Sequence, residues 1–119
     1  MAPTTREIPR EEWREYFDDF SSGLATTLAS IEVTGPEIGA QVEAERGVLR
    51  GITYDDGDDI VVIALDSEGD EPGELERTVS EPQKIYVEEE NATTVLDIED
   101  SEGNKTLVRM EPAAQLPPA

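Results

Sequence analysis

The sequence of 119 residues contains no cysteine and no histidine. Within a single chain these absences exclude thiol nucleophiles, disulfides, thiolate or imidazole zinc sites, Ser-His-Asp triads and histidine general bases. Any chemistry that this chain performs with its own side chains must therefore use carboxylate, lysine, tyrosine or hydroxyl groups. Histidine-dependent and cysteine-dependent enzyme classes are removed from consideration.

Positive charge is also scarce. The chain has 9 basic residues against 29 acidic ones, which gives a formal net charge of −20, and Lys84 and Lys105 are its lysines. Nucleic-acid affinity comes largely from Lys and Arg that displace counterions, and anionic lipid surfaces attract the same residues. We therefore expect neither a nucleic acid nor a membrane as a partner.

Three interpretations of this acidity remain open. The surface can be adapted to molar salt, where a Debye length of about 3 Å screens self-repulsion. It can belong to an ordinary acidic protein, or it can dock on a basic partner or mimic nucleic acid. We favour the first interpretation, a surface suited to a high-salt cytoplasm.

Long apolar runs are absent. The N-terminal stretch MAPTTREIPREEW lacks the apolar core of a signal peptide, and the run from Ile60 to Leu65 is far too short to span a membrane. We expect a soluble cytoplasmic protein with one folded domain at residues 8–110. Residues 1–7 are predicted to be a flexible arm, and residues 111–119 a disordered proline-rich tail.

Aromatic residues make up only 5% of the chain, and most of them lie in one short stretch. The spacing of Trp13, Tyr16, Phe17 and Phe20 predicts an amphipathic helix that begins at Ile8-Pro9, with this stripe facing the core. A ligand groove lined by the same residues is the alternative. Gly23 is predicted to end the helix in the left-handed conformation.

Alternating or continuous apolar patterns then predict β-strands within residues 24–33, 38–54, 60–65, 74–80, 84–88, 94–99 and 106–110. Gly47 and Gly51 are expected to mark bulges or bends. The predicted fold class is α+β. We expect an N-terminal helix followed by a curved antiparallel meander of about six or seven strands, or by a small barrel of the SH3-like or Sm-like kind.

Several segments resemble a known family. REIPREEW (residues 6–13), GPEIGAQVEAE (35–45), LRGITYD (49–55) and TLVRM (106–110) are similar to a small uncharacterised bacterial family, a domain of unknown function. The resemblance covers the chain from about residue 6 to residue 110. It implies a bacterial source and a single-domain protein, and it carries no activity, cofactor or catalytic residue.

The motif DDGDD is the first candidate site. It places Asp55, Asp56, Asp58 and Asp59 around Gly57. An EF-hand loop is excluded, because Gly57 at its sixth position leaves the first and third positions without carboxylates. Asp-Gly between two apolar runs predicts a hairpin with a primed turn. A weak divalent-ion site formed by the four aspartates is the alternative, and a catalytic acid cluster is a third.

Arginines are the second candidate site. Arg46, Arg50, Arg77 and Arg109 each lie in or beside a predicted strand, so a cluster on one sheet face could receive an anionic ligand or a partner's carboxylate. Pairing with neighbouring Asp or Glu across strands is the structural alternative.

We therefore predict a non-enzymatic binding or interaction module, without a cofactor, whose partner is an unidentified protein or small ligand. The alternative is a carboxylate-dependent, divalent-metal-assisted hydrolase built on the DDGDD aspartates. The sequence gives no prediction of the oligomeric state.

Overall fold

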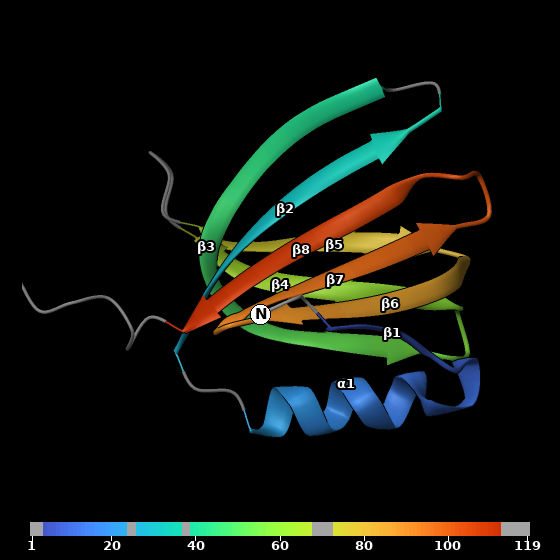
Figure 1. Cartoon of the computed structure of the whole chain (residues 1–119), viewed down its shortest axis with the longest axis horizontal. Coiled ribbons are helices and arrows are strands. Elements are labelled where there is room, and N and C mark those ends of the chain that lie inside the picture. Colours follow the sequence, from blue (N-terminus) through green and yellow to red (C-terminus); the bar gives the residue numbers. More distant parts are fainter. Residues whose placement is uncertain (1–3, 24–25, 37–38, 68–72, 113–119) are drawn as a thin grey trace, which may run out of the picture.

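The computed structural model describes residues 4–23, 26–36, 39–67 and 73–112 (Figure 1). The helical elements are short and follow the first strand. In chain order the elements are β1 (Thr4–Ile8), the 3-10 helix η1 (Arg10–Glu12), α1 (Trp13–Ser22), β2 (Thr27–Gly35), β3 (Gly39–Asp55), β4 (Ile60–Ser67), β5 (Gly73–Ser80), β6 (Pro82–Glu90), β7 (Thr93–Asp100) and β8 (Lys105–Pro112).

The strands form one antiparallel sheet in the order β1-β6-β7-β8-β2-β3-β4-β5. Two meanders, β2 to β5 and β6 to β8, are joined where β8 pairs with β2. The sheet curls so that β5 comes close to β7 (Figure 1), but β1 and β5 remain its two edges. The described strands therefore form an open, curled sheet.

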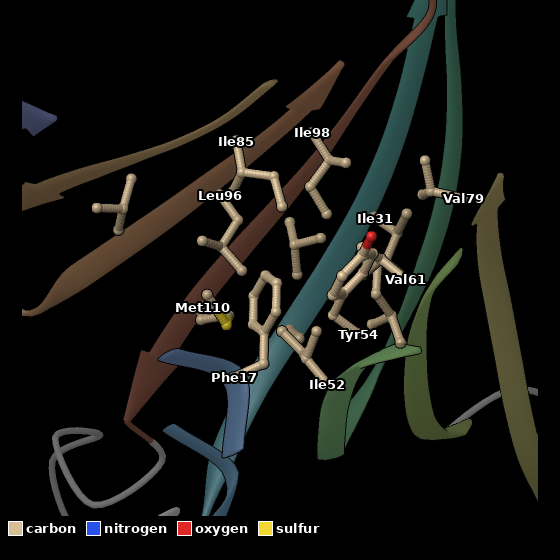
Figure 2. Packing of buried hydrophobic residues seen from close by; sticks show 14 of the residues in the cluster. Phe17, Ile31, Ile52, Tyr54, Val61, Val79, Ile85, Leu96, Ile98 and Met110 are labelled. Atoms are coloured by element: carbon tan, nitrogen blue, oxygen red, sulfur yellow. The ribbon is translucent and has the colours of Figure 1, made fainter. Parts of the chain in front are cut away.

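The core lies on the inner, concave face of this sheet, which also packs against α1. Alternation along each strand sends one set of side chains inward. Phe17 and Trp13 from α1 are buried among them, and Figure 2 shows Phe17 among Ile52, Leu96 and Met110. The Trp13 indole Nε1 donates a hydrogen bond of 2.8 Å to the backbone oxygen of Ile8, which satisfies its polar group within the core.

The end of α1 is attached to the long strand β3. The Ser21 hydroxyl donates to the backbone oxygen of Ile52 at 2.9 Å and accepts from the Ile52 backbone N–H at 3.0 Å. The β3–β4 register shifts between Leu49 and Gly51, and a Cβ on Gly51 would lie 3.5 Å from the Ser21 oxygen. The predicted bulge near Gly51 is confirmed, and it lies where the helix approaches the strand.

At one end of the sheet, three turns are joined by backbone hydrogen bonds. Glu81 N–H donates to the Asp59 carbonyl at 2.9 Å, and Ser101 N–H donates to the Glu81 carbonyl at 3.1 Å. These residues belong to the β3–β4, β5–β6 and β7–β8 connections. The two sides of the curled sheet are therefore linked through their turns at this end, although their strands do not pair.

The predicted fold class is wrong in four respects, one of which is the number of strands: the described residues form eight, not about six or seven. The first element is the strand β1, which pairs with β6, rather than a helix. The eight strands are not one meander, and the sheet does not close into a barrel. Residues 4–7 of β1 are exposed, so the sequence shows no apolar alternation there. The strand is formed by its backbone pairing with β6.

Local details of the helix also differ from the prediction. Pro9 precedes η1, and α1 itself begins at Trp13. Gly23 follows α1 with φ −97°, which is not the left-handed conformation. The helix ends there through hydrogen bonds from the Gly23 N–H to Asp19 and Ser21 carbonyls. The predicted core stripe is confirmed, with Trp13 and Phe17 buried and the other two aromatic side chains packed against the core.

The predicted tail lies mostly outside the described residues, which end at Pro112 within β8.

Candidate functional site

The DDGDD motif forms the turn between β3 and β4. The Asp55 carboxylate Oδ1 accepts hydrogen bonds from the backbone N–H groups of Gly57, at 3.0 Å, and Asp58, at 3.3 Å. The positive φ of this turn lies at Asp59, with φ 54°, and not at Gly57. The predicted hairpin turn is confirmed. The predicted primed Asp-Gly geometry is wrong, because Asp59, two residues after the glycine, takes the left-handed conformation.

Asp59 has a structural role at this turn. Its Oδ1 accepts a hydrogen bond of 2.7 Å from the Tyr54 hydroxyl and lies 3.5 Å from an Arg10 guanidinium nitrogen. Burial, together with the Asp59 carboxylate, raises the pKa of Tyr54 above 10.0. Arg10 also donates to the Pro82 carbonyl at 2.9 Å and lies over the Trp13 ring at 4.4 Å. The turn is thus fixed to the beginning of the helical segment.

The remaining aspartates of the motif do not gather into a metal cage in the described part of the chain. Asp56 lies 3.9 Å from Arg14, with both side chains exposed. Over the described residues, no group of three or more carboxylates is placed to hold a metal ion. The divalent-ion site on Asp55, Asp56, Asp58 and Asp59 stays a prediction, and two of its members already serve as acceptors within the turn.

The four arginines separate into three environments. Arg50 forms an ion pair of 2.9 Å with Asp66 on the outer face of the sheet. Arg77 lies opposite Ile63 on the inner face of the edge strand β5. It lines a pocket of about 470 Å³ that also includes Asn104 and Thr106 at the turn end of the sheet. Arg46 and Arg109 share the outer face of β3, β2 and β8.

Arg46 and Arg109 lie on either side of Ser30. Strand register places Ser30 directly opposite Arg46 of β3 and directly opposite Arg109 of β8. Ser30 stands between Ala29 and Ile31, which are buried, so all three aligned residues point outward. Both arginine side chains are exposed, and no carboxylate of the described residues forms an ion pair with either. We call Arg46 and Arg109 the arginine pair.

A groove adjoins the arginine pair on the same outer face. It has a volume of about 670 Å³, crosses β1, β6, β7 and β8, and includes Arg109. This size falls within the usual range of ligand pockets, about 300–1,000 Å³. Besides Arg109, it is lined by Thr5, Tyr86, Glu88, Glu90, Asn91, Thr93, Val95, Asp97 and Leu107.

The groove was not predicted from the sequence. One feature of the sequence could have indicated it. Val95 and Leu107 are apolar although they point outward, while their inward neighbours Leu96 and Val108 already supply the core. Apolar residues at both sets of positions indicate a second surface that excludes water. Only the register, which brings these residues beside Tyr86, shows that they form one groove.

Asp97 is the chemically distinctive residue of the groove. Its Oδ1 is buried, and no hydrogen-bond partner reaches it in the described part of the chain. Burial raises the pKa of Asp97 above its ordinary value of 3.8, Lys105 opposes that rise, and Glu99 adds to it. A buried carboxylate oxygen without a donor is costly, and it disfavours the ionised form of Asp97.

The fold and the site together define a small curled-sheet protein with an inner face occupied by its own helix and an outer face that is open for contacts. The chain belongs to a family of unknown function, DUF5335, whose model matches residues 4–119. It is 38% identical over 114 residues to an uncharacterized protein of Aquifex aeolicus (strain VF5), which covers 95% of this chain and 97% of that protein.

No solved structure matches the chain. Among the described residues, neither helix is long and apolar enough to cross a membrane. The family assignment agrees with the predicted resemblance to an uncharacterised family, and it brings no activity with it.

Proposed function

We propose that this protein is a non-enzymatic binding module that receives a carboxylate of a partner protein on the arginine pair. The observation that carries the proposal is the register that aligns Arg46, Ser30 and Arg109 on the outer face. A proposed setting of this activity is a high-salt cytoplasm, for which the net charge of −20 is suited.

The spacing of the pair fits a single carboxylate. Neighbouring strands lie about 4.8 Å apart, so the two arginine Cα atoms, which are two strands apart, are separated by about 10 Å. Arginine side chains are long enough to bring both guanidinium groups over Ser30 from that distance. Guanidinium forks match carboxylate geometry, and the Ser30 hydroxyl lies between them as a further donor.

The charge balance of the chain also supports a partner. With 29 acidic residues and 9 basic ones, an arginine has many possible partners within its own protein. Arg50, on the same face, is paired with Asp66 in this way. Arg46 and Arg109 form no such ion pair with the described residues, so their charge is available to another molecule.

The test is a comparison of two small probes by NMR at constant ionic strength. N-acetyl-diglycine, which has a free carboxylate, should shift the side-chain Nε–Hε signals of Arg46 and Arg109, and the matching amide should not. Replacing both arginines with glutamine should weaken binding at least fivefold, since an ion-pair contact of about 1 kcal/mol corresponds to about that factor.

Arg50→Gln is the matched control, because Arg50 lies on the same face but is already paired with Asp66. It should leave the affinity for the probe unchanged. Equal responses to the acid and the amide, or undiminished binding by the Arg46→Gln/Arg109→Gln variant, would overturn the proposed function.

A further inference from the structure

The groove beside the arginine pair has the opposite charge. Glu88, Glu90 and Asp97 line it together with Arg109, so three carboxylates face one guanidinium. Three carboxylates together with one arginine suit a ligand that carries both a positive and a negative charge. A purely anionic ligand would meet repulsion from the carboxylates beyond Arg109.

The groove also has a place for an aliphatic stem. Tyr86, Val95 and Leu107 provide the apolar part of its lining. Tyr86 and Leu107 both lie directly opposite Asp97 on the neighbouring strands, β6 and β8. An alkyl chain that crosses this surface would therefore lead its end toward the Asp97 carboxylate. Lysine and arginine side chains combine such a stem with a terminal donor.

The Asp97 carboxylate is only partly compensated within the protein. Its buried Oδ1 accepts no hydrogen bond from the described residues. An ammonium or guanidinium group in the groove would offset the negative charge of the Asp97 carboxylate, which burial disfavours. Glu88 and Glu90 would contribute a favourable field around the same cation, since they line the same groove.

The acidic groove and the arginine pair are close enough to bind one short segment. Register pairs Val95 with Arg109 and Asp97 with Leu107, so Asp97 and Arg109 are diagonal neighbours on β7 and β8. Diagonal residues on adjacent strands lie about 7–8 Å apart. A single lysine residue with a free carboxylate spans that separation, because its ammonium and its carboxylate lie at opposite ends of the molecule.

We infer that the partner is a protein segment in which a basic side chain and a carboxylate lie next to each other, as they do in a C-terminal lysine. The basic side chain lies in the groove against Asp97, and the carboxylate lies on the arginine pair. This inference rests on the proposed function, since it assigns the second half of the same binding surface. The bound part of the partner segment therefore carries one positive and one negative charge, separated by an aliphatic stem.

The test uses three acetylated dipeptide probes and one amine. Acetyl-Gly-Lys with a free carboxylate should bind at least tenfold more tightly than acetyl-Gly-norleucine, which has a similar stem and no charge. Asp97→Asn should remove this preference and leave the weaker, arginine-dependent binding of the norleucine probe. Butylamine alone should bind more weakly than acetyl-Gly-Lys.

Glu99→Gln is the control, because Glu99 faces outward on the same strand but is paired with Lys105, at 3.8 Å, and does not line the groove. It should retain the preference for lysine. The melting temperature of Asp97→Asn shows that the variant is folded. Equal binding of the lysine and norleucine probes, with binding still dependent on Arg46 and Arg109, would overturn this inference and leave the proposed function intact.

Two further outcomes distinguish a failure of the proposed function from a failure of the inference about the partner. If acetyl-Gly-lysinamide, which lacks the free carboxylate of acetyl-Gly-Lys, binds as tightly as that acid, the arginine pair is not the carboxylate site. The proposed function then fails, although the Asp97 groove is supported. If butylamine binds as tightly as acetyl-Gly-Lys, a free amine rather than a protein segment is the occupant, and the partner assignment is overturned.

Discussion

Asp97 combines a buried carboxylate oxygen with a position that contributes nothing to the inner core. Burial raises its pKa above 3.8. A group whose folded-state pKa is raised stabilises the folded state below the unfolded pKa and loses that contribution as pH rises through the folded pKa. Asp97 is therefore a residue whose ionisation costs stability at neutral pH.

Asp97→Asn should raise the melting temperature at pH 7, because it removes the cost of ionising a buried carboxyl. The gain should disappear when the pH falls below the ordinary aspartate value of 3.8, where Asp97 is protonated in both states. Thermal unfolding of both proteins across this range measures the effect. Glu99→Gln provides a comparison, and a gain independent of pH would contradict the explanation.

Asp58 and Asp59 are neighbours in the β3–β4 turn, but only Asp59 accepts a hydrogen bond from Tyr54. Asp59→Ala should destabilise the protein by about 1–3 kcal/mol, because the Tyr54 hydroxyl loses its acceptor and alanine disfavours the positive φ. Asp58→Asn should change stability by less than about 0.5 kcal/mol, because it keeps the turn. Urea unfolding measures both, and equal effects would contradict the assignment of the turn's structural role to Asp59.

At the scale of single elements, α1 is held to β3 by Ser21. Ser21→Ala should cost about 1–2 kcal/mol, since it removes both hydrogen bonds with the backbone of Ile52 in a partly buried place. Ser22→Ala is the matched control. The Ser22 hydroxyl bonds only to the Asp19 carbonyl at 3.1 Å in an exposed position, so its loss should be small. Similar denaturation midpoints for the two variants would contradict this attachment.

The elements also show what the sequence can predict. The aromatic stripe of α1 and the alternation of the strands were predictable, because burial imposes a period on the side chains. Strand β1 was not, since exposed residues 4–7 impose no period and its stability comes from backbone bonds to β6. The long strand β3 was predicted as a continuing pattern, and its bulge near Gly51 was marked by the glycine.

The candidate site was less predictable than the elements. All four arginines were identified from the sequence, but only register shows that Arg46 and Arg109 meet at Ser30 while Arg77 lies on the other face. Register and strand order depend on contacts between distant segments, such as the pairing of β2 with β8, which local patterns do not specify. Local chemistry therefore suggested the residues, and the topology selected among them.

At the scale of the whole molecule, the net charge of −20 must affect stability. Self-repulsion destabilises a compact state, and salt screens it. The melting temperature should rise by several degrees as potassium chloride increases from about 0.05 M to about 2 M. A melting temperature that does not change over this range would contradict the high-salt interpretation of the surface.

The filled inner face has a further consequence for substitutions in strands β6, β7 and β8. Alternation places neighbouring residues of these strands on opposite faces, so that Leu96 and Val108 lie in the core while Val95, Asp97 and Arg109 lie on the outer face. Substitutions at the outward positions need not disturb the packing around α1. The outward positions of these strands can therefore change in charge and shape without loss of the folding core.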